Sequence, residues 1–539
     1  MRTSLPGPLR GGALLAFFAN ASDFTRRLTS VKANGKFCHP DAGPDDEWTG
    51  VHERLGDVVA SLKARYGLDY VYVWHGLPAY WAGVMPGDQE NGAAQRRIMF
   101  AQPTRYGGGV LEVEPSMAWN PAVLAGVGVV TEPAALYNRM HAYLSAAGVD
   151  GVKVDCQAGI GLMGSALGGG AALSRTFHAA LESSVASHFR DNHCINCMCH
   201  STENIYRMTG TAVARVSDDF YPRDPASSSP HIAACAYNGL FMGVLTQPDW
   251  DMFHSKHASA DTHALARAVS GGAVYVSDKP GEHDFELLRR LVLPDGSVLR
   301  ARHGARPTRD CLLVDVLRDG VSLLKVWNRN AHTGVVGVFH LQGSSWDRTR
   351  RKFFVHDAEP DLLSVTVRPV DVEGMVVALE QQAGADADQR YALYTHHTRR
   401  LSLVHATDGV NVSLASGKAE AVTVACVLMT PDGAVTFAPL GLVDMYNGGG
   451  AVTGVSCGHG DSSSGSSGSG GSMDGGGPPP SFTVGVRGTG RFLCHCSRRP
   501  ACVSTNSLAL AFEYDGDNGS LHVDVPHTPD LAVSLAFVF

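Results

Sequence analysis

The chain has 539 residues, of which 44% are hydrophobic and 18% are charged, so it is long enough for two or more globular domains with a sizeable core. Its net charge of −8 and the lack of a concentrated basic face argue against nucleic acid as a partner. No apolar run approaches the roughly 20 residues of a membrane span. The 12 cysteines are scattered, which is typical of a reducing compartment. We expect a cytoplasmic protein, although the basic and then apolar opening also fits a plastid or secretory address.

Segments with helical and with strand character alternate between about residues 50 and 280. Apolar residues recur at helical spacing in 51–67, 131–148, 171–189 and 261–269. Thr131 is predicted to cap the second of these helices, with Pro133 in its first turn. Six strands are predicted, in "YVYVWH", "GVKVDC", "CINCMCH", "TAVARVSDDF", "LFMGVLTQPDWD" and "AVYVSDK". Because each helix must return the chain to the same edge, the alternation predicts a parallel sheet.

The predicted strands share one feature, which is that polar residues follow at their ends. These residues are Trp74-His75, Asp155, His200, Asp218-Asp219, Asp249 to Asp251 and Asp278-Lys279. A β/α barrel builds its active site at the carboxyl ends of its strands, so we predict a barrel whose site contains these side chains. A doubly wound open sheet also binds ligands at strand ends, but no G-x-G-x-x-G follows the first strand.

Beyond residue 300 the sequence changes to short β-rich runs such as "CLLVDVL", "SLLKVWN", "GVVGVFHLQG", "KAEAVTVACVLM" and "SLALAFEYDG". They predict an antiparallel β-sandwich. A Ser/Gly-rich insert at about 448–481 is too poor in apolar residues to order itself and is predicted to be a flexible loop. We therefore expect an N-terminal part with a barrel helix (1–50), a barrel (51–300) and a sandwich (301–539).

Lys153 and Asp155 are two positions apart on a predicted strand, so their side chains share one face. An ammonium beside a carboxylate favours the ionised acid, as an attacking nucleophile requires. The alternative is a buried structural ion pair.

A second acidic pair, Asp218 and Asp219, ends the strand that carries Arg215. If the strand continues through the pair, Asp219 shares the face of Arg215, and crowding favours the protonated form of one carboxyl, as a general acid requires. The alternative is that one of the two caps the following helix. Acids from two strands suit glycoside chemistry. Aromatic residues that either stack on sugar rings or belong to the core are Trp74, Tyr80, Trp81, Tyr221 and Trp250.

The run "CINCMCH" has metal-like spacing at Cys194, Cys197, Cys199 and His200. It lacks a second C-x-x-C elsewhere, and strand alternation places Cys197 and Cys199 on one face of a core strand. We favour the core strand and expect no metal. The phosphate-binding motif G-x-x-x-x-G-K-[ST] is absent from the sequence, and we predict no Ser-His-Asp catalysis.

Several long motifs together resemble one family. They are "GVDGVKVDCQ", "ARVSDDFYPRDPAS", "QPDWDMFHSKH", "VYVSDKPGEHDF", "LVLPDGSVLRA", "ARPTRDCLLVD" and "SLLKVWNRNAHTGVVGVFHLQGSSW". From about residue 16 to the C-terminus the chain resembles the plant-type raffinose synthase, seed imbibition protein and alkaline α-galactosidase family of glycoside hydrolase family 36. The resemblance implies a β/α barrel of the retaining type, which acts on galactinol, sucrose and raffinose-type α-galactosides without a cofactor.

Site roles follow from the same resemblance. It implies that Asp155 is the nucleophile, that Lys153 binds galactose hydroxyls, and that Asp219 is the acid/base, with Asp218 as its rival. It also implies a sugar pocket lined by His75, Trp81, Gln157, Arg215, Trp250 and Asp251.

The predicted function is galactosyl transfer from galactinol to sucrose. Hydrolysis of the same donors is the alternative, because "SDDFYP" resembles the seed imbibition and alkaline galactosidase branch. The resemblance also implies an eight-stranded barrel of which this chain lacks the first two strands, so a third expectation is a non-catalytic sugar-binding relative.

Overall fold

The computed structural model describes residues 25–31, 55–86, 96–100, 126–350, 352–376, 389–459, 479–506 and 508–539. The chain divides into two compact units. The amino-terminal unit comprises residues 1–215 and 348–351, and the carboxy-terminal unit comprises 216–347 and 352–539. Most of the predicted N-terminal part, 1–50, lies outside the described residues. Among the described helices, none is long and apolar enough to cross a bilayer.

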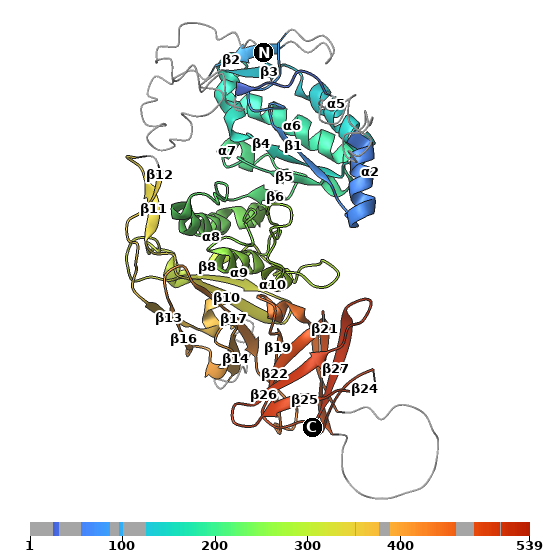
Figure 1. Ribbon diagram of the computed structural model, residues 1–539, viewed down its shortest axis with the longest axis vertical. Coiled ribbons are helices and arrows are strands. Elements are labelled where there is room, and N and C mark those ends of the chain that lie inside the picture. Colours follow the sequence, from blue (N-terminus) through green and yellow to red (C-terminus); the bar gives the residue numbers. More distant parts are fainter. Residues whose placement is uncertain are drawn as a thin grey trace, which may run out of the picture. The chain divides into compact units, whose positions relative to one another are not determined.

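The amino-terminal unit alternates strands and helices (Figure 1). Its elements are α2 (Leu55–Tyr66), β1 (Tyr72–Gly76), β2 (Arg96–Met99), β3 (Val127–Val130), α5 (Pro133–Ala146), β4 (Gly151–Asp155), η4 (Ala158–Ala166), α6 (Gly170–His188), β5 (Cys194–Asn196), α7 (Thr202–Ile205) and β6 (Val213–Arg215). Strands β1, β4, β5 and β6 pair in this order, and each pair is parallel. The predicted parallel β/α arrangement is confirmed.

The core of this unit lies between the sheet and its helices. Val152 and Val154 of β4 are fully buried, and they belong to one cluster with Phe177 and Leu181 of α6. Burial of each such side chain contributes about 1.5–3 kcal/mol. Because successive residues of a strand point to opposite faces, burial of Val152 and Val154 against the helices places Lys153 and Asp155 on the other face.

Helix starts differ slightly from the prediction. Pro133 lies in the first turn of α5 as expected, but the N-cap residue is Glu132, which makes no side-chain capping bond, so the prediction of Thr131 as the cap was wrong. Gly148 follows the helix with φ +79°, a conformation that glycine adopts without strain.

The carboxy-terminal unit begins with helices and continues with strands. Its helices and first strands are η6 (Pro225–Ser227), α8 (Ser228–Leu245), β7 (Gln247–Asp249), α9 (Ala260–Ser270), α10 (Phe285–Arg289), β8 (Arg306–Pro307), η7 (Arg309–Cys311), β9 (Leu324–Arg329), β10 (Thr333–Phe339), β11 (Ser344–Asp347), β12 (Lys352–Val355), β13 (Leu363–Val367), η8 (Pro369–Asp371), β14 (Arg390–Thr395), β15 (Arg400–His405), β16 (Val410–Leu414) and β17 (Ala419–Cys426). A six-stranded sheet, β15-β14-β17-β10-β9-β8, packs against α9.

Two five-stranded sheets follow. They contain β18 (Leu428–Met429), β19 (Thr436–Leu442), β20 (Val452–His459), β21 (Pro480–Arg487), β22 (Gly490–Cys496), β23 (Cys502–Thr505), β24 (Leu508–Ala509), β25 (Phe512–Asp515), β26 (Ser520–Val525) and β27 (Ala532–Val538). The sheets run β18-β19-β22-β26-β25 and β20-β21-β27-β23-β24, and every pair is antiparallel. Phe437 of one sheet stacks on Phe482 of the other at 4.7 Å, which confirms the predicted sandwich.

Four predicted segments need correction. The run Leu240–Leu245 is the end of α8 rather than a strand, and only β7 follows it. "AVYVSDK" contributes a single bridge at Val276, and "CLLVDVL" begins at the last residue of η7 and continues as turns in which Leu313 is exposed. Strands β20 and β21 pair within the limits predicted for the flexible insert, whose remainder, 460–478, lies outside the described residues. The predicted boundary near residue 300 stays a prediction.

Candidate active site

The site begins with the pairing of β1 and β4 in the amino-terminal unit. Trp74 lies opposite Lys153, and Gly76 lies opposite Asp155. Partners in a parallel register point to the same side of the sheet, so Trp74 shares a face with Lys153 and Asp155. This face is opposite to the one that packs on the helices.

Both carboxylate oxygens of Asp155 accept hydrogen bonds. The Trp74 indole Nε1 donates to Oδ2 at 3.1 Å, and the Cys156 amide donates to Oδ1 at 2.7 Å. Leu77 N donates to the Asp155 carbonyl at 2.7 Å, which ties the end of β4 to the turn after β1. Asp155 as a whole residue is 8% exposed. Hydrogen bonds to a carboxylate fix its direction, so the side chain of Asp155 is held in one orientation at the strand end.

The backbone after Asp155 is unusual. Cys156 has φ +57°, in the left-handed region that non-glycine residues seldom adopt. Such residues cost about 1–3 kcal/mol and persist where the surrounding structure determines them, often at functional sites. The chain thus changes direction directly after Asp155.

An aromatic cluster stands beside Asp155. The Trp74 ring lies 5.5 Å from the Trp81 ring and 5.6 Å from the Tyr80 ring, and all three side chains are half-buried. Aromatic faces of this kind bind the C–H face of a sugar ring. Trp81, predicted to line a sugar pocket, is thus near the proposed nucleophile, and Trp74 is a site residue whose hydrogen bond the sequence did not reveal.

Lys153 shares the face of Asp155 but does not pair with it. Within the part of the chain that the structure describes, no ion pair joins the two side chains, so the expected ammonium–carboxylate contact is corrected. The oxygens of Asp155 are occupied by Trp74 and Cys156 instead. The alternative, a buried structural ion pair between Lys153 and Asp155, is wrong for the same reason.

His75 lies on the helix side of the sheet. Its Nε2 lies 3.1 Å from Nε2 of His141 on α5, and Nδ1 of His141 lies 2.8 Å from the Ser184 hydroxyl on α6. Burial lowers the pKa of His75 to about 4, so the ring is neutral at physiological pH. The prediction of His75 as a pocket residue is therefore wrong, because strand alternation turns its side chain away from Asp155.

Gln157 is enclosed within the turn after β4. Its Nε2 donates to the Val154 carbonyl at 3.0 Å and to Asn196 Oδ1 at 2.8 Å, and Asn196 Nδ2 donates to the Thr211 hydroxyl at 2.9 Å. The side chain is fully buried. Gln157 therefore positions the turn that carries Asp155. The sequence did not predict this role of Asn196, because it lies in the run "CINCMCH", whose cysteines suggested a metal site instead.

The cysteine-rich segment forms part of the core. Cys194, Cys197 and Cys199 are buried, and burial raises the pKa of the Cys199 thiol to about 12. Arg215, at the end of β6, is 1% exposed and donates from Nη1 to the Cys197 sulfur at 3.9 Å. No group of three or more His, Cys, Asp or Glu side chains among the described residues is arranged to hold a metal ion.

In the carboxy-terminal unit, Asp218 and Asp219 lie in an exposed bend. Strand β6 ends at Arg215, so the strand does not continue through the pair and the predicted parity with Arg215 is wrong. The alternative helix cap is wrong as well, because Asp224 caps the next helical turn by accepting from Ala226 N at 3.1 Å.

Asp251 supports the bend that holds Asp219. Its Oδ2 accepts from Phe220 N at 2.7 Å, and its backbone has φ +65°. Arg267 Nε donates to the Asp251 carbonyl at 3.1 Å, and the Tyr275 hydroxyl donates to Asp249 Oδ2 at 2.8 Å. Asp251 thus anchors the amide next to Asp219.

Trp250 is fully buried, so its ring offers no face to a sugar in this structure, and its predicted role in the pocket is corrected. Arg267 and Tyr275 were missed by sequence reasoning. A signal existed for Arg267, since "THALARAV" places a charged residue among apolar ones in a helix.

Residues 16–525 match the family described as raffinose synthase or seed imbibition protein Sip1. The chain is 43% identical over 505 residues to "Probable galactinol–sucrose galactosyltransferase 6" of Arabidopsis thaliana, which covers 93% of this chain and 63% of that protein. It is 36% identical over 490 residues to the galactinol–sucrose galactosyltransferase of Oryza sativa subsp. japonica, which covers 88% and 58%.

A stachyose synthase of Pisum sativum is 33% identical over 480 residues, with 86% of this chain and 52% of that protein covered. The chain therefore spans between 52% and 63% of the length of these three relatives.

Proposed function

Because the chain belongs to the family of raffinose synthases and seed imbibition proteins, we propose that it transfers an α-galactosyl group from galactinol to sucrose with retention of configuration. The observation that carries this proposal is the setting of Asp155. It stands at the end of a parallel strand, both of its oxygens are oriented by N–H donors, and aromatic rings lie beside it. The names of the relatives support galactinol as donor and sucrose as acceptor.

In the proposed mechanism, a carboxylate oxygen of Asp155 attacks the anomeric carbon of galactinol. The bond from that carbon to the inositol oxygen breaks, and Asp219 gives its proton to the leaving oxygen. A hydroxyl of sucrose then attacks the galactosyl-enzyme ester. Asp219 takes the proton of that hydroxyl, and Asp155 leaves as a carboxylate. Two inversions give net retention.

Lys153 is proposed to bind galactose hydroxyls. Its ammonium has three donors, and it shares the face of Asp155 without pairing with it. Trp81 and Trp74 supply an apolar surface beside the ring. Gln157, Arg215 and Asp251 are proposed to hold the catalytic loops rather than the sugar.

Hydrolysis of the same donors is a second candidate, because water can attack the ester in place of sucrose and because the matched family includes the seed imbibition proteins. The test is to incubate the chain with galactinol, with and without sucrose, and to separate the products. Raffinose in the presence of sucrose supports transfer. Free galactose without raffinose assigns hydrolysis, and the absence of both products contradicts the proposal and favours a non-catalytic sugar-binding protein.

A further inference from the structure

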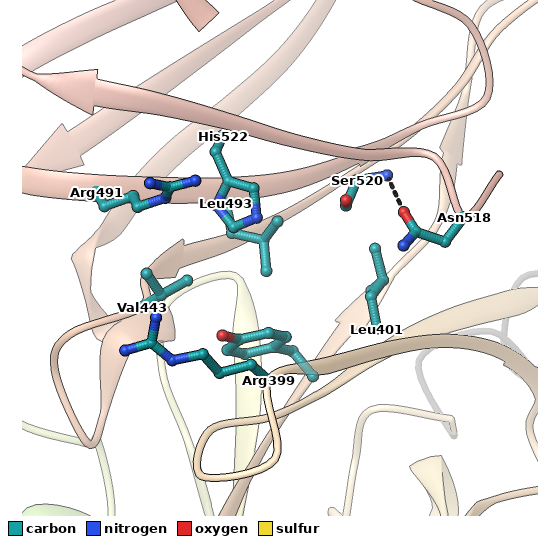
Figure 2. A pocket seen from close by; sticks show the side chains of 9 residues that line it. Arg399, Leu401, Val443, Arg491, Leu493, Asn518, Ser520 and His522 are labelled. Carbon is teal, nitrogen blue, oxygen red and sulfur yellow. Dashed lines mark hydrogen bonds between the residues drawn. The ribbon is translucent and has the colours of Figure 1, made fainter. Parts of the chain in front are cut away.

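A cavity of about 200 Å³ lies in the carboxy-terminal unit, between the six-stranded sheet and one sheet of the sandwich (Figure 2). Strands β14 and β15 line it from one side and β22 and β26 from the other. The lining residues are Tyr394, Arg399, Leu401, Val443, Arg491, Leu493, Asn518, Ser520 and His522. The volume equals that of about six or seven waters in the liquid. It therefore suits a small ligand of phosphate to monosaccharide-phosphate size.

The charged groups of the lining are all basic. Arg399 and Arg491 are two guanidinium groups, His522 adds an imidazole, and none of the lining residues is acidic. Arg491 pairs with Glu513, whose side chain is 74% exposed, and an ion pair so open to water neutralises little charge. Arg399 has no salt bridge to a carboxylate in the described part of the chain. The lining itself therefore carries net positive charge, while Glu513, Asp524 and Asp444 are acidic groups near it.

The hydrogen-bonding capacity of the lining is dominated by donors. Arg399 and Arg491 only donate. The acceptor oxygen of Asn518 is already taken by Ser520 N at 2.8 Å, a bond visible in Figure 2, while its amide nitrogen donates to Asp515 at 2.8 Å. A neutral sugar needs acceptors for its own hydroxyl protons, and the side-chain acceptors left in the lining are the hydroxyls of Tyr394 and Ser520 and the imidazole of His522. An oxyanion, which only accepts, fits this set of groups.

The backbone at the mouth of the cavity is strained. Arg399 has φ +52° in the turn between β14 and β15. A non-glycine residue in this region costs about 1–3 kcal/mol, and the turn could relieve that cost with glycine or asparagine. In Figure 2 the Arg399 side chain extends along the cavity opposite Arg491 and His522. The two guanidinium groups thus approach one space from different sheets.

Part of the cavity lining is apolar. Leu493 is 1% exposed and belongs to the buried cluster that joins the two sheets, and Leu401 and Val443 pack against that cluster. A low-dielectric surface strengthens the attraction between an anion and the arginines above it. The Nδ1 atom of His522 is buried and has no hydrogen-bond partner.

The charged groups near the imidazole of His522 shift its pKa. Burial lowers its pKa, and Arg491 and Arg399 lower it further, while Glu513 and Asp524 act in the opposite direction. Both arginines of the lining are thus close enough to His522 to disfavour its protonated form.

We propose that this cavity is a binding site for a small phosphate-bearing anion, either inorganic phosphate or a phosphate monoester, held by the guanidinium groups of Arg399 and Arg491. The planar guanidinium matches phosphate oxygens in a two-bond geometry, and such charged hydrogen bonds are the strong ones. The site is separate in sequence from the residues proposed for galactosyl transfer and does not depend on that function.

The test is calorimetric titration of the full chain with inorganic phosphate and with glucose 6-phosphate at constant ionic strength. Sodium chloride and glucose serve as control titrants. We expect saturable binding of at least one phosphate ligand and about tenfold or greater weakening in Arg399→Gln and in Arg491→Gln. Arg400→Gln is the matched control, because Arg400 is also exposed and is the next residue, but it does not line the cavity.

The two ligands distinguish the source of the phosphate group. Tighter binding of glucose 6-phosphate assigns a phosphate ester, and equal binding assigns the phosphate group alone. The proposal is overturned if neither ligand binds above the chloride background, if glucose binds as well as its phosphate ester, or if Arg400→Gln weakens binding as much as Arg399→Gln. Unchanged thermal melting of each variant shows that it is folded.

Discussion

At the residue scale, the proposed chemistry depends on one carboxylate and the groups that donate hydrogen bonds to it. Asp155 was located from sequence because β-branched neighbours define the strand and parity sets its face. Its contacts were not predicted, since the Trp74 bond depends on the register of β1 against β4 and the Cys156 bond on how the backbone leaves the end of β4. Neither feature follows from a local pattern. The pairing of Lys153 with Asp155 was expected from parity alone, which does not determine where a flexible side chain ends.

Replacing the proposed nucleophile gives the first prediction. Asp155→Gly removes the attacking oxygen and should lower turnover of galactinol at least about a thousandfold. Added azide should enter the vacated space and attack once, giving β-galactosyl azide of inverted configuration. The measurement is product analysis by proton NMR, with an activated donor such as an aryl α-galactoside.

Asp219→Gly and Asp218→Gly are the matched variants for this experiment. Loss of the acid/base leaves Asp155 in place, so azide attacks the galactosyl-enzyme and gives the α-azide. We expect this product with Asp219→Gly and little change with Asp218→Gly. An inverted azide from either variant, or a retained one from Asp155→Gly, would refute the assignment of Asp155.

The indole donor of Trp74 gives the second prediction. Trp74→Phe keeps an aromatic ring but removes the N–H that holds Asp155 Oδ2. A hydrogen bond to a charged group contributes about 1.5–3 kcal/mol, so kcat/KM should fall about tenfold to a hundredfold. Tyr80→Phe is the control, since its ring also packs on Trp74. Equal losses in both variants would show that packing, not the hydrogen bond, is what matters.

At the element scale, α9 is joined to the six-stranded sheet by a polar network. His397, after β14, contacts Asp261 of α9 at 3.2 Å and Glu420 of β17 at 3.2 Å. Hydrogen bonds to Asp261 and then Glu420 raise the pKa of His397 to about 9. Burial alone would raise the pKa of Asp261, but the bonds from His397 and Tyr446 lower it.

This network makes stability depend on pH. Because the pKa of His397 is about 9 in the folded chain and about 6.5 in an unfolded one, its stabilisation is complete below about pH 6.5 and is lost as pH rises through 9. The melting temperature of His397→Gln should therefore lie furthest below that of the unmodified chain near pH 6, and the two should converge by about pH 9.5. His405→Gln, at an exposed histidine of β15, should show no such trend. A gap that widens with pH would show that the sign is wrong.

Lys325 of β9 gives another prediction at this scale. It is fully buried and contacts Asp371 and Asp310, each at 2.8 Å, and the Thr366 carbonyl at 3.1 Å. Lys325→Met fills a similar volume but leaves Asp371, which is 11% exposed, without its cation. Breaking a buried pair costs about 3–5 kcal/mol. Urea unfolding should show this loss, whereas Lys352→Met, at an exposed position of β12, should be neutral.

Elements with a strong local period were predicted well. The fourfold spacing of Leu173, Phe177, Leu181 and Val185 defines α6, and all four residues are buried. The run Leu240–Leu245 was misread, because a short apolar segment fits both a buried strand and a helix end, and the helix that precedes it decides between them. The apolar letters of "CLLVDVL" were misread for the same reason, since Leu313 is exposed there.

At the scale of the whole molecule, the order of elements was predictable and several long-range contacts were not. Alternation of helices and strands gave the parallel sheet, and dense short β runs gave the sandwich, since both follow from local periods. Arg267 contacts the Asp251 loop, which lies in a different segment of the chain. Arg399 lines a cavity together with residues of another sheet. Such contacts depend on packing, which one sequence does not encode in any short pattern.

The central claim is that galactosyl transfer passes through an ester on Asp155. The most direct measurement is to incubate the chain with a fluorinated α-galactosyl fluoride that forms this ester quickly and loses it slowly, and then to digest the protein and locate the added mass by mass spectrometry. The account predicts one fluorogalactosyl group per chain, on the peptide that contains Asp155, and its release when sucrose is added. A label on any other carboxylate, or turnover of galactinol by a chain that never becomes labelled, would contradict it.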